Sequence, residues 1–479
     1  MMMPTTLEVA GRDGDWIAVD ALDIEGLDDR LDGPILRAGD EGWDDAILLW
    51  NGMAQKSPAL VVQPTSARDV AAAVNFARDR GLALSVKGGG HNIAGTAIAQ
   101  DGLTLDMSRL RAVVVDPTAR VVHAGAGCLL QHVDAATQDH GLATVLGFIS
   151  ETGMAGLTLG GGFGYLTRRF GWAVDNLVEV EIVTADGQIR TANTTDNAEL
   201  FWALRGGGGN FGVVTRFTFR VHEVGPTITG GLVAWDAQRT DEVLAAYAEL
   251  TDSAPRELTA AAMIRLAPPA PFVPEEWHGR PVVAMLVCHS GSNPVADLGP
   301  LQALGEPAFG LVTEKPYVAQ QAMLDAMDRK GMHQYWKTEF LPGLSPAYCD
   351  TFRDAALDVA SPLSFSVIFH IEGALNERDA DDGAIGNRDA AFVSGFSGAW
   401  PPDTDGDGIV AAVRRGWQRI HPFSTGGNYV NFQLAEDNVE RTASAYGTNH
   451  GRLGRAKGIY DPDNVFRSNR NISPAINAA

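Results

Sequence analysis

The chain has 479 residues and a formal net charge of −22 at pH 7. This length allows two domains with large cores, and the negative charge argues against nucleic acid or membrane as a partner. Cys128, Cys288 and Cys349 have no metal-type spacing, and no basic leader or long apolar run is visible. We therefore expect a cytoplasmic protein without structural disulfides or a metal site.

The first half of the chain alternates short strands with helices that end at glycine. Ser66 forms a capping box with Asp69 and begins a predicted helix that ends at Gly81, and residues 82–86 form an apolar strand. Further strands are expected at 103–106, 112–116 and 121–124, and a further helix at 129–140.

The apolar strand leads into a glycine loop, where Gly88, Gly89 and Gly90 precede His91. Consecutive glycines let backbone N–H groups approach an anion, as a phosphate-binding loop requires. A histidine at its rim could ligate a metal, act as a base or bond covalently to a cofactor. The simpler alternative is a tight turn followed by an ordinary surface histidine.

Three later stretches give the glycine loop its context: 147–164, Asp175-Asn176, and 205–214. Residues 207–212 match G-x-G-x-x-G, but a predicted strand follows where a Rossmann fingerprint requires a helix, and residues 160–164 lack a P-loop ending. Four loops that expose backbone favour a long ligand containing phosphate, such as a dinucleotide.

Composition changes after Gly225-Pro226, where we place a domain boundary. Residues 227–425 mix strand-like runs with amphipathic helices, as expected for an antiparallel sheet covered by helices. Residues 403–408 resemble the start of a calcium loop, but its twelfth position is Arg414, so a solvated turn is expected. Residues 426–479 are turn-rich and are expected to return to the first domain, which gives an α+β chain overall.

These elements together resemble the berberine-bridge-enzyme-like branch of the vanillyl-alcohol-oxidase flavoproteins. The resemblance covers nearly the whole chain and rests on the motifs at 64–66, 88–92, 156–164, 175–176, 204–214, 429–431 and 460–466. It implies a PCMH-type FAD-binding domain of two α/β subdomains (1–226), an inserted substrate domain (227–425) and a C-terminal segment (426–479). It also implies FAD bound covalently by its 8α-methyl group through His91.

The resemblance further implies a set of residues in contact with FAD. Asn92 and Gly95 would hold the pyrophosphate, the Val214 backbone would pair with adenine, and Thr152 would control access of oxygen. The full expected set is Val86, Lys87, Gly88, Gly89, Gly90, His91, Asn92, Gly95, Gly147, Ser150, Thr152, Gly153, Gly156, Leu157, Gly160, Gly161, Gly164, Asp175, Asn176, Gly209, Asn210, Gly212, Val213, Val214, Tyr429 and Asn431.

Many relatives carry a second covalent link from a cysteine eleven residues before the glycine cluster. Ile149 occupies that position here, and Cys128 lies on a different element. The resemblance therefore implies a single attachment through His91, with no cysteinyl link.

The catalytic base also departs from some plant relatives, because Phe432 stands where they carry a tyrosine. Tyr429 is the first candidate, as a phenol of lowered pKa beside the flavin, and a core tyrosine with one hydrogen bond is the alternative. Asn431 is expected to orient the substrate. Tyr165 is a further candidate for the pocket wall.

Two strands of the substrate domain offer additional polar candidates. Tyr335, Lys337 and Glu339 share one face of a predicted strand, and if that face covers the flavin, Lys337 could steady negative charge. His370 shares a face of the next strand with Ser366, and a structural histidine is the alternative to a pocket residue.

The resemblance implies an FAD-dependent oxidase that removes hydride from a C–H next to an OH or NH group of an alcohol, sugar or secondary metabolite. Dioxygen would take the electrons and become hydrogen peroxide. The alternatives are a flavin-dependent dehydrogenase or oxidative cyclase, and a retired flavin-binding protein. Neither substrate identity nor oligomeric state can be read from the residues.

Overall fold

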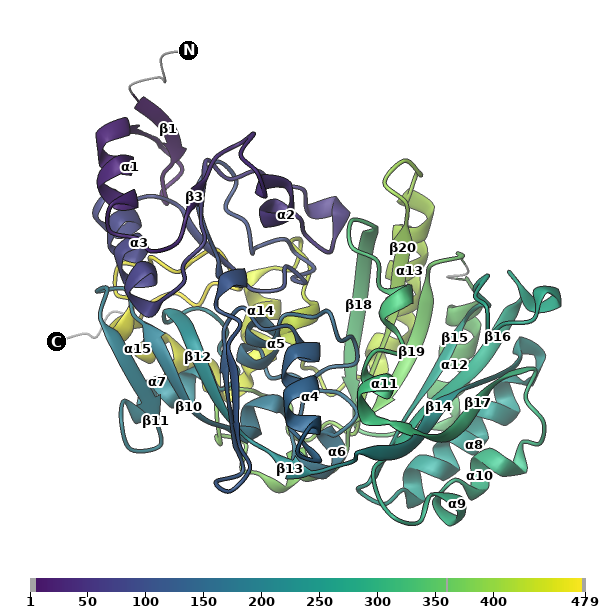
Figure 1. Cartoon of the computed structure of the whole chain (residues 1–479). Helices are drawn as coiled ribbons and strands as arrows, with labels where there is room; N and C mark the ends of the chain where they lie inside the picture. The colour runs from purple at the N-terminus through teal and green to yellow at the C-terminus, as the bar shows by residue number, and fades with distance from the viewer. Residues whose placement is uncertain (1–5, 359–360, 476–479) are drawn as a thin grey trace.

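The computed structural model describes residues 6–358 and 361–475. Figure 1 shows elements from both chain ends packed together on one side and a large sheet with its helices on the other. This mixed arrangement confirms the predicted α+β class. In the part of the chain described, no helix is long and apolar enough to cross a membrane.

The elements from β1 to β13, residues 6–223, form an amino-terminal body with two principal sheets. One is four-stranded, with three parallel neighbours, in the order β3 (Ile35–Leu36), β4 (Leu60–Val62), β6 (Leu103–Asp106), β5 (Leu84–Lys87). The other is antiparallel, in the order β11 (Ile189–Asn193), β10 (Leu177–Val183), β12 (Val213–Arg220), β8 (Val121–Gly125), β7 (Val113–Asp116). Two small pairs join β1 (Thr6–Ala10) to β2 (Trp16–Asp20) and β9 (Leu142–Ala143) to β13 (His222–Glu223).

Helix α3 (Ala67–Asp79) shows why these elements form where they do. Its N-cap is Ser66, whose side chain accepts the Asp69 N–H, and Val70 and Val74 are buried on one face. The other helices of the amino-terminal body are α1 (Ala21–Asp28), α2 (Trp43–Ile47), α4 (Leu130–Gln138), α5 (Met154–Leu159), α6 (Thr167–Phe170) and α7 (Ala198–Leu204).

A seven-stranded antiparallel sheet occupies the other side of the molecule (Figure 1). Its order is β17 (Phe309–Pro316), β14 (Thr227–Asp236), β16 (Pro281–His289), β15 (Leu258–Leu266), β19 (Phe365–His370), β20 (Phe392–Trp400), β18 (His333–Leu341). The helices between these strands are α8 (Thr240–Ser253), α9 (Pro294–Asp297), α10 (Gly299–Ala303), α11 (Tyr317–Gln321) and α12 (Pro346–Asp358), and α13 (Asp407–Ile420) follows the last strand.

The two faces of this sheet have different neighbours. Alternate residues such as Ala262 and Ile264 pack with Tyr247 of α8 and Phe352 of α12 in one core. Met263, between them, packs with aromatic residues of the amino-terminal body in a second core. This alternation leaves one face of the sheet directed at the amino-terminal body, where a ligand can lie between the two.

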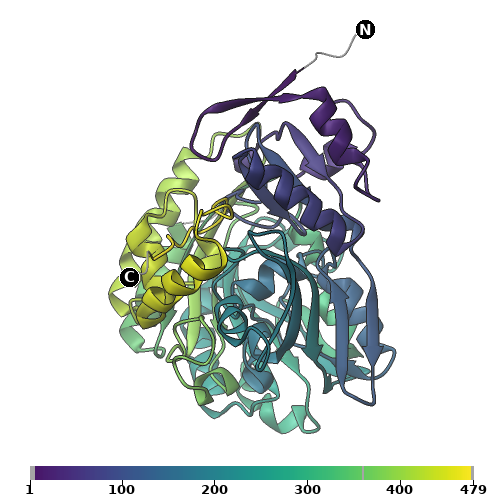
Figure 2. The same cartoon turned by 90° about the vertical axis from the view of Figure 1, so that its left-hand side faces the viewer.

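The C-terminal segment returns to the amino-terminal body, as Figure 2 shows for the yellow helices α14 (Val439–Tyr446) and α15 (His450–Tyr460). The Lys457 ammonium group is fully buried, donates to the Asn210 carbonyl at 2.6 Å and pairs with Asp461 at 2.5 Å. Phe466 belongs to the same core as β10 and β12. The C-terminal segment thus supports the glycine-rich segment before β12 through Lys457.

Candidate active site

A continuous cavity lies between the amino-terminal body and the seven-stranded sheet. The glycine loop after β5, the segment 147–160 and the loop before β12 line it from the amino-terminal body. Tyr429 to Phe432 and Ser468 to Arg470 line it from the C-terminal segment. Elements distant in the sequence therefore contribute to one site, as expected for a dinucleotide.

The fit of an FAD molecule can be judged from the backbone of the loops. A Cβ atom at Gly89 would lie 2.4 Å from the Gly153 nitrogen, so only glycine allows these two loops to touch. A Cβ atom at Gly160 would lie 2.1 Å from the Asn431 Oδ1 atom. The close backbone packing leaves a cavity bordered by peptide groups, which suit a pyrophosphate and a flat ring.

His91 lies in the wall of the cavity beside an acid and an indole. Its Nδ1 atom is 3.7 Å from Asp328 Oδ2, and its ring stacks on Trp50 with centroids 5.7 Å apart. The Trp50 Nε1–H group donates to Asp328 Oδ1 at 3.0 Å. Within the described residues, the buried Nε2 atom of His91 has no hydrogen-bond partner, which leaves it available to a ligand.

Burial changes the charge of both titratable groups at this point. It lowers the pKa of His91 to about 3, helped by the nearby Lys330 ammonium group. It raises the pKa of Asp328 to about 7, although the Trp50 hydrogen bond opposes this. At neutral pH the imidazole is uncharged, which is the nucleophilic form.

Tyr429 and Asn431 lie together beside the glycines that follow α5, Gly160 to Gly162. The Tyr429 hydroxyl oxygen accepts hydrogen bonds from the Gly162 N–H at 3.0 Å and the Asn431 Nδ2–H at 2.9 Å. Burial nevertheless raises the pKa of Tyr429 to about 12. The expectation of a lowered pKa is wrong, because two hydrogen bonds do not offset complete desolvation.

The structure brings most of the expected site residues together in this cavity. Those that line it are Val86, Gly88, Gly89, Gly90, His91, Asn92, Gly147, Thr152, Gly153, Gly156, Leu157, Gly160, Gly209, Asn210, Gly212, Val213, Val214, Tyr429 and Asn431. Those that lie outside its lining are Lys87, Gly95, Ser150, Gly161, Gly164, Asp175, Asn176, Tyr165 and Lys337.

Several of these outlying residues hold the surrounding structure instead. The Lys87 ammonium group is 3.7 Å from Asp106 Oδ1, and Ser150 Oγ donates to Asp325 Oδ2 at 2.5 Å. Tyr165 packs edge-on against Phe148, with ring centroids 4.8 Å apart.

Asp175 and Asn176 stabilise the turn between α6 and β10 and do not line the cavity. The Asp175 carboxylate is buried and pairs with Arg388 Nη2 at 2.8 Å, and it also accepts the Trp172 N–H. The Asn176 side-chain amide donates to the carbonyls of Phe170 and Trp172. These hydrogen bonds and ion pairs of Asp175 and Asn176 are therefore made within the protein.

Close approach to neighbouring segments explains the remaining glycines. A Cβ atom at Gly95 would lie 2.3 Å from Ala54 Cβ, and one at Gly161 would lie 2.3 Å from Ile385 Cδ1. A Cβ atom at Gly164 would lie 2.1 Å from the Leu146 carbonyl oxygen.

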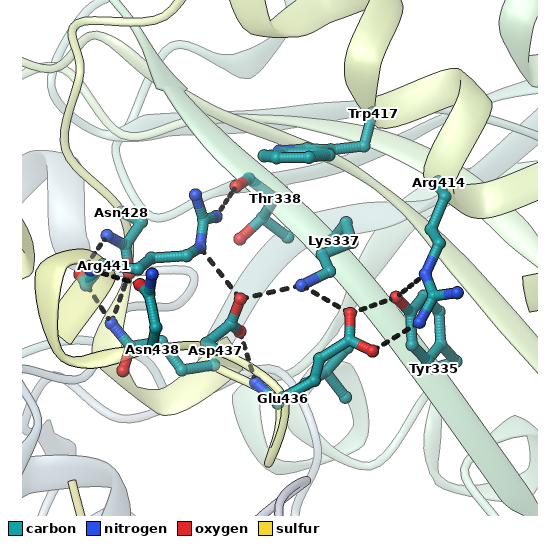
Figure 3. Close-up of polar contacts among 12 residues, drawn as sticks. Tyr335, Lys337, Thr338, Arg414, Trp417, Asn428, Glu436, Asp437, Asn438 and Arg441 are labelled. Atoms are coloured by element: carbon teal, nitrogen blue, oxygen red, sulfur yellow. Dashed lines mark hydrogen bonds and ion pairs between the residues drawn. The ribbon is translucent and has the colours of Figure 1, made fainter.

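Lys337 is directed away from the cavity into a charged cluster on the opposite face of β18 (Figure 3). Its ammonium group pairs with Asp437 at 2.8 Å and with Glu436 at 3.0 Å, while Arg441 Nε lies 3.3 Å from Asp437. The predicted shared face of Tyr335, Lys337 and Glu339 does not cover the cavity. Lys337 is therefore not in position to act on a substrate in the cavity.

The face of the sheet that does border the cavity is largely apolar. It contributes Met263, Arg265, Trp336, Phe365 and Phe369. His370 points to the other face, where it stacks on Phe392 with centroids 4.9 Å apart. The cavity-lining residues of these strands are not predicted from the sequence, because they are mostly apolar and the sequence does not fix which alternate residues of a strand face the cavity.

The loop residues Trp50 and Asp328 were also missed. Each lies outside any regular periodic segment and takes its role from the three-dimensional packing around His91. In the sequence, no motif of fixed spacing joins either residue to the glycine loop.

Comparison with known proteins agrees with this arrangement. The FAD binding domain family matches residues 58–193, and the family described as berberine and berberine like matches residues 428–473. (R)-6-hydroxynicotine oxidase of Paenarthrobacter nicotinovorans is 30% identical over 456 residues, covering 93% of this chain and 97% of the relative. An FAD-linked oxidoreductase of Dictyostelium discoideum is 29% identical over 456 residues, covering 94% and 96%.

Solved structures show the same fold over nearly the whole chain. 6-Hydroxy-D-nicotine oxidase from Arthrobacter nicotinovorans superposes with a TM-score of 0.81 at 26% identity, covering 93% of this chain and 98% of that one. Xylooligosaccharide oxidase from Myceliophthora thermophila gives 0.83 at 22% identity, covering 95% and 100%. With the cavity between its two bodies, the chain belongs to the berberine-bridge-enzyme-like family of FAD-linked oxidoreductases, as its sequence motifs indicate.

Proposed function

We propose that this protein is an oxidase that holds FAD covalently through His91 and oxidises a small molecule at a C–H group next to an OH or NH group. Bound FAD would supply the oxidising power: the substrate carbon would lose a hydride while its OH or NH group loses a proton, and dioxygen would accept the two electrons and two protons to become hydrogen peroxide. The observation that carries the proposal is the uncharged, buried His91 in the wall of a backbone-lined cavity.

A single covalent link is proposed, because no cysteine is among the described residues that line the cavity. Ile149 lines the cavity at the position where many relatives carry cysteine. The Cys128 sulfur instead lies 3.9 Å from the Ala112 carbonyl, and burial raises the pKa of this thiol to about 11. Cys128 is therefore neither in position nor ionised at neutral pH.

The chain's own groups would bind and orient the substrate. Tyr429 keeps its proton at neutral pH, so we assign it to positioning, together with Asn431, rather than to proton removal. Thr152 lines the cavity and is proposed to influence the access of oxygen. Three free cysteines support the proposed cytoplasmic location.

The apolar sheet face narrows the choice among the substrates named for relatives. Oxidases of a hydroxynicotine and of xylooligosaccharides both share the fold. Met263, Trp336, Phe365 and Phe369 offer no hydrogen-bonding side chain except the Trp336 Nε1–H, which donates to Gln334. A flat, largely apolar molecule suits these four side chains better than a sugar with many hydroxyl groups.

Covalent attachment is tested by acid precipitation of wild type, His91→Ala and the control His140→Ala, an exposed histidine. Flavin should stay with the denatured wild type and control, and wash out of His91→Ala. Loss of flavin from denatured wild type would overturn the proposed link.

The oxidase reaction is tested with the holoenzyme and a panel of amines, alcohols and sugars. We expect peroxide release with one class and reoxidation of the reduced enzyme in air at least as fast as turnover. Reoxidation slower than turnover would instead indicate a dehydrogenase or an oxidative cyclase.

A further inference from the structure

Arg265 is the one arginine that the sheet strands contribute to the cavity wall among the described residues. It lies on β15, two residues after Met263 and on the same face. Its guanidinium group donates to the Leu266 carbonyl at 3.1 Å, to Met327 Sδ at 3.0 Å and to the Pro362 carbonyl at 3.5 Å. Neither a carboxylate nor any other anion of the described chain pairs with it.

Two buried arginines of this protein have stronger partners. Arg388 pairs with the Asp175 carboxylate, and Arg168 donates to the carbonyls of Glu372, Pro255 and Ala254. Arg265 has weaker partners, since a thioether sulfur is a poor acceptor and the Pro362 contact is long. The Arg265 side chain is only partly exposed, and a partly desolvated guanidinium without an anion gains from a ligand that supplies the missing negative charge.

The surroundings of Arg265 specify the rest of that ligand. Its strand partner across the sheet is Phe365, and Phe365 packs edge-on against Trp336 with ring centroids 5.3 Å apart. Met263 and Phe369 continue the apolar wall. A ligand that reaches the guanidinium therefore lies with its body against aromatic and thioether side chains, which favour a flat ring.

The only carboxylate lining the cavity in the described part of the chain is already engaged. Asp328 accepts the Trp50 indole N–H and faces His91. It follows Met327 directly in the chain, so the Met327 contact places Arg265 near the same end of the cavity. The positive charge is thus free to bind substrate at a site separate from the Tyr429 and Asn431 pair.

We propose that Arg265 binds the carboxylate of a flat, aromatic substrate and so fixes its orientation in the cavity. This inference rests on the proposed function, because it names the class of molecule that the oxidase would accept. The planar guanidinium can give two parallel N–H bonds to a carboxylate, which orients as well as attracts. Burial lowers the pKa of Arg265 to about 10, so the charge is present at neutral pH.

Isothermal titration calorimetry of the purified holoenzyme with cinnamate and its neutral isostere cinnamamide tests the proposal. We expect wild type to bind cinnamate about tenfold more tightly than cinnamamide, as for a charge-assisted hydrogen-bonded pair. Arg265→Met keeps an unbranched apolar side chain but removes the guanidinium group, and it should reduce this preference to about twofold or less. Arg265→Lys keeps the charge without the planar fork and should give an intermediate preference.

The matched control is Arg280→Met, at the residue directly before β16. Arg280 pairs with Asp236 at 3.2 Å, and its side chain is 52% exposed, so this variant removes one positive charge from the same sheet outside the cavity. It should keep the wild-type preference for cinnamate. Equal binding of the two probes to wild type, failure of both to bind, or an unchanged preference in Arg265→Met would each overturn the proposal.

Failure of this inference is distinguishable from failure of the proposed function. Flavin retention and peroxide release are measured on the same preparations, independently of the calorimetry. A holoenzyme that releases peroxide but shows no carboxylate preference contradicts only the role of Arg265. A carboxylate preference that is lost in Arg265→Met supports that role even if no oxidase activity is found.

Discussion

The Nδ1 atom of His91 lies 3.7 Å from the Oδ2 atom of Asp328, so a histidine of the amino-terminal body faces a carboxyl group from the sheet side of the cavity. Burial lowers the pKa of His91 to about 3 and raises that of Asp328 to about 7. Near neutral pH, an uncharged imidazole thus faces a carboxyl group that can gain or lose a proton. Such a pair can move a proton away from the histidine when the histidine forms a bond.

The first prediction concerns Asp328→Asn and the formation of the covalent link. If the Asp328 carboxylate accepts the imidazole proton, covalent incorporation of FAD into flavin-free protein should accelerate as pH rises through about 7. Asp328→Asn should lose this pH step and incorporate flavin at least about tenfold more slowly. The measurement is intact-protein mass against time after FAD is added, at several pH values.

Asp325→Asn is the matched control for this experiment. Asp325 lies three residues earlier and contacts the backbone N–H and hydroxyl of Ser150, not His91. This variant should keep the pH step but move it to lower pH, because the Asp325 charge contributes to the raised pKa of Asp328. The same rate and pH profile in Asp328→Asn and wild type would contradict a role for Asp328 in proton transfer.

The second prediction separates positioning from proton removal at Tyr429. Its pKa is about 12, so an ionised phenol is scarce at neutral pH and a large loss of rate is not expected. Tyr429→Phe should lower kcat by about tenfold or less and leave the pH profile between 6 and 9 in place. Steady-state kinetics with the identified substrate measures both. A loss of about a thousandfold would instead mark Tyr429 as the base.

The glycine-rich elements could be predicted from sequence because their function depends on backbone, and backbone exposure is encoded locally by glycine. The side chains that line the cavity from the seven-stranded sheet could not be predicted, because a shift of one residue in a strand reverses which side chains face the ligand. Lys337 and Trp336 illustrate this: the lysine pairs with Glu436 and Asp437, whereas the tryptophan lines the cavity. No local pattern distinguishes the two faces when both are buried.

Asp175 shows a second limit of sequence reasoning, because a family motif can be structural. Its place in the Asp175-Asn176 motif is clear from the sequence, but its carboxylate accepts hydrogen bonds from Arg388 and from the Trp172 N–H. A motif of fixed spacing therefore identifies which residues are required without saying whether they contact the ligand.

The third prediction follows from the ion pair between Asp175 and Arg388. Asp175→Asn leaves the buried Arg388 guanidinium without its anion and should reduce the free energy of unfolding by about 3 kcal/mol. The folded fraction should still retain flavin after acid precipitation, since Asp175 does not line the cavity. Thermal unfolding and flavin content of the same sample measure the two effects. Normal stability combined with loss of flavin would show that Asp175 contacts the cofactor.

The fourth prediction concerns Asp134 on α4, which accepts a hydrogen bond from Gln321 of α11 at 2.9 Å. Burial raises the pKa of Asp134 from 3.8 to about 7. The folded state therefore holds a proton that the unfolded chain releases, so this group makes stability fall as pH rises from 3.8 to about 7. Asp134→Asn keeps the shape without the charge, so its stability relative to wild type should increase over this range, by on the order of 2 kcal/mol.

Urea unfolding midpoints of wild type and Asp134→Asn at pH 5 and pH 8 test this. The comparison between variants is essential, because a chain with a net charge of −22 has other sources of pH-dependent stability. Asp139→Asn removes a carboxylate from the exposed end of the same helix and should change stability equally at both pH values. If Asp134→Asn also changes stability equally at both, then Asp134 is ionised in the folded protein and its contact with Gln321 is that of a carboxylate.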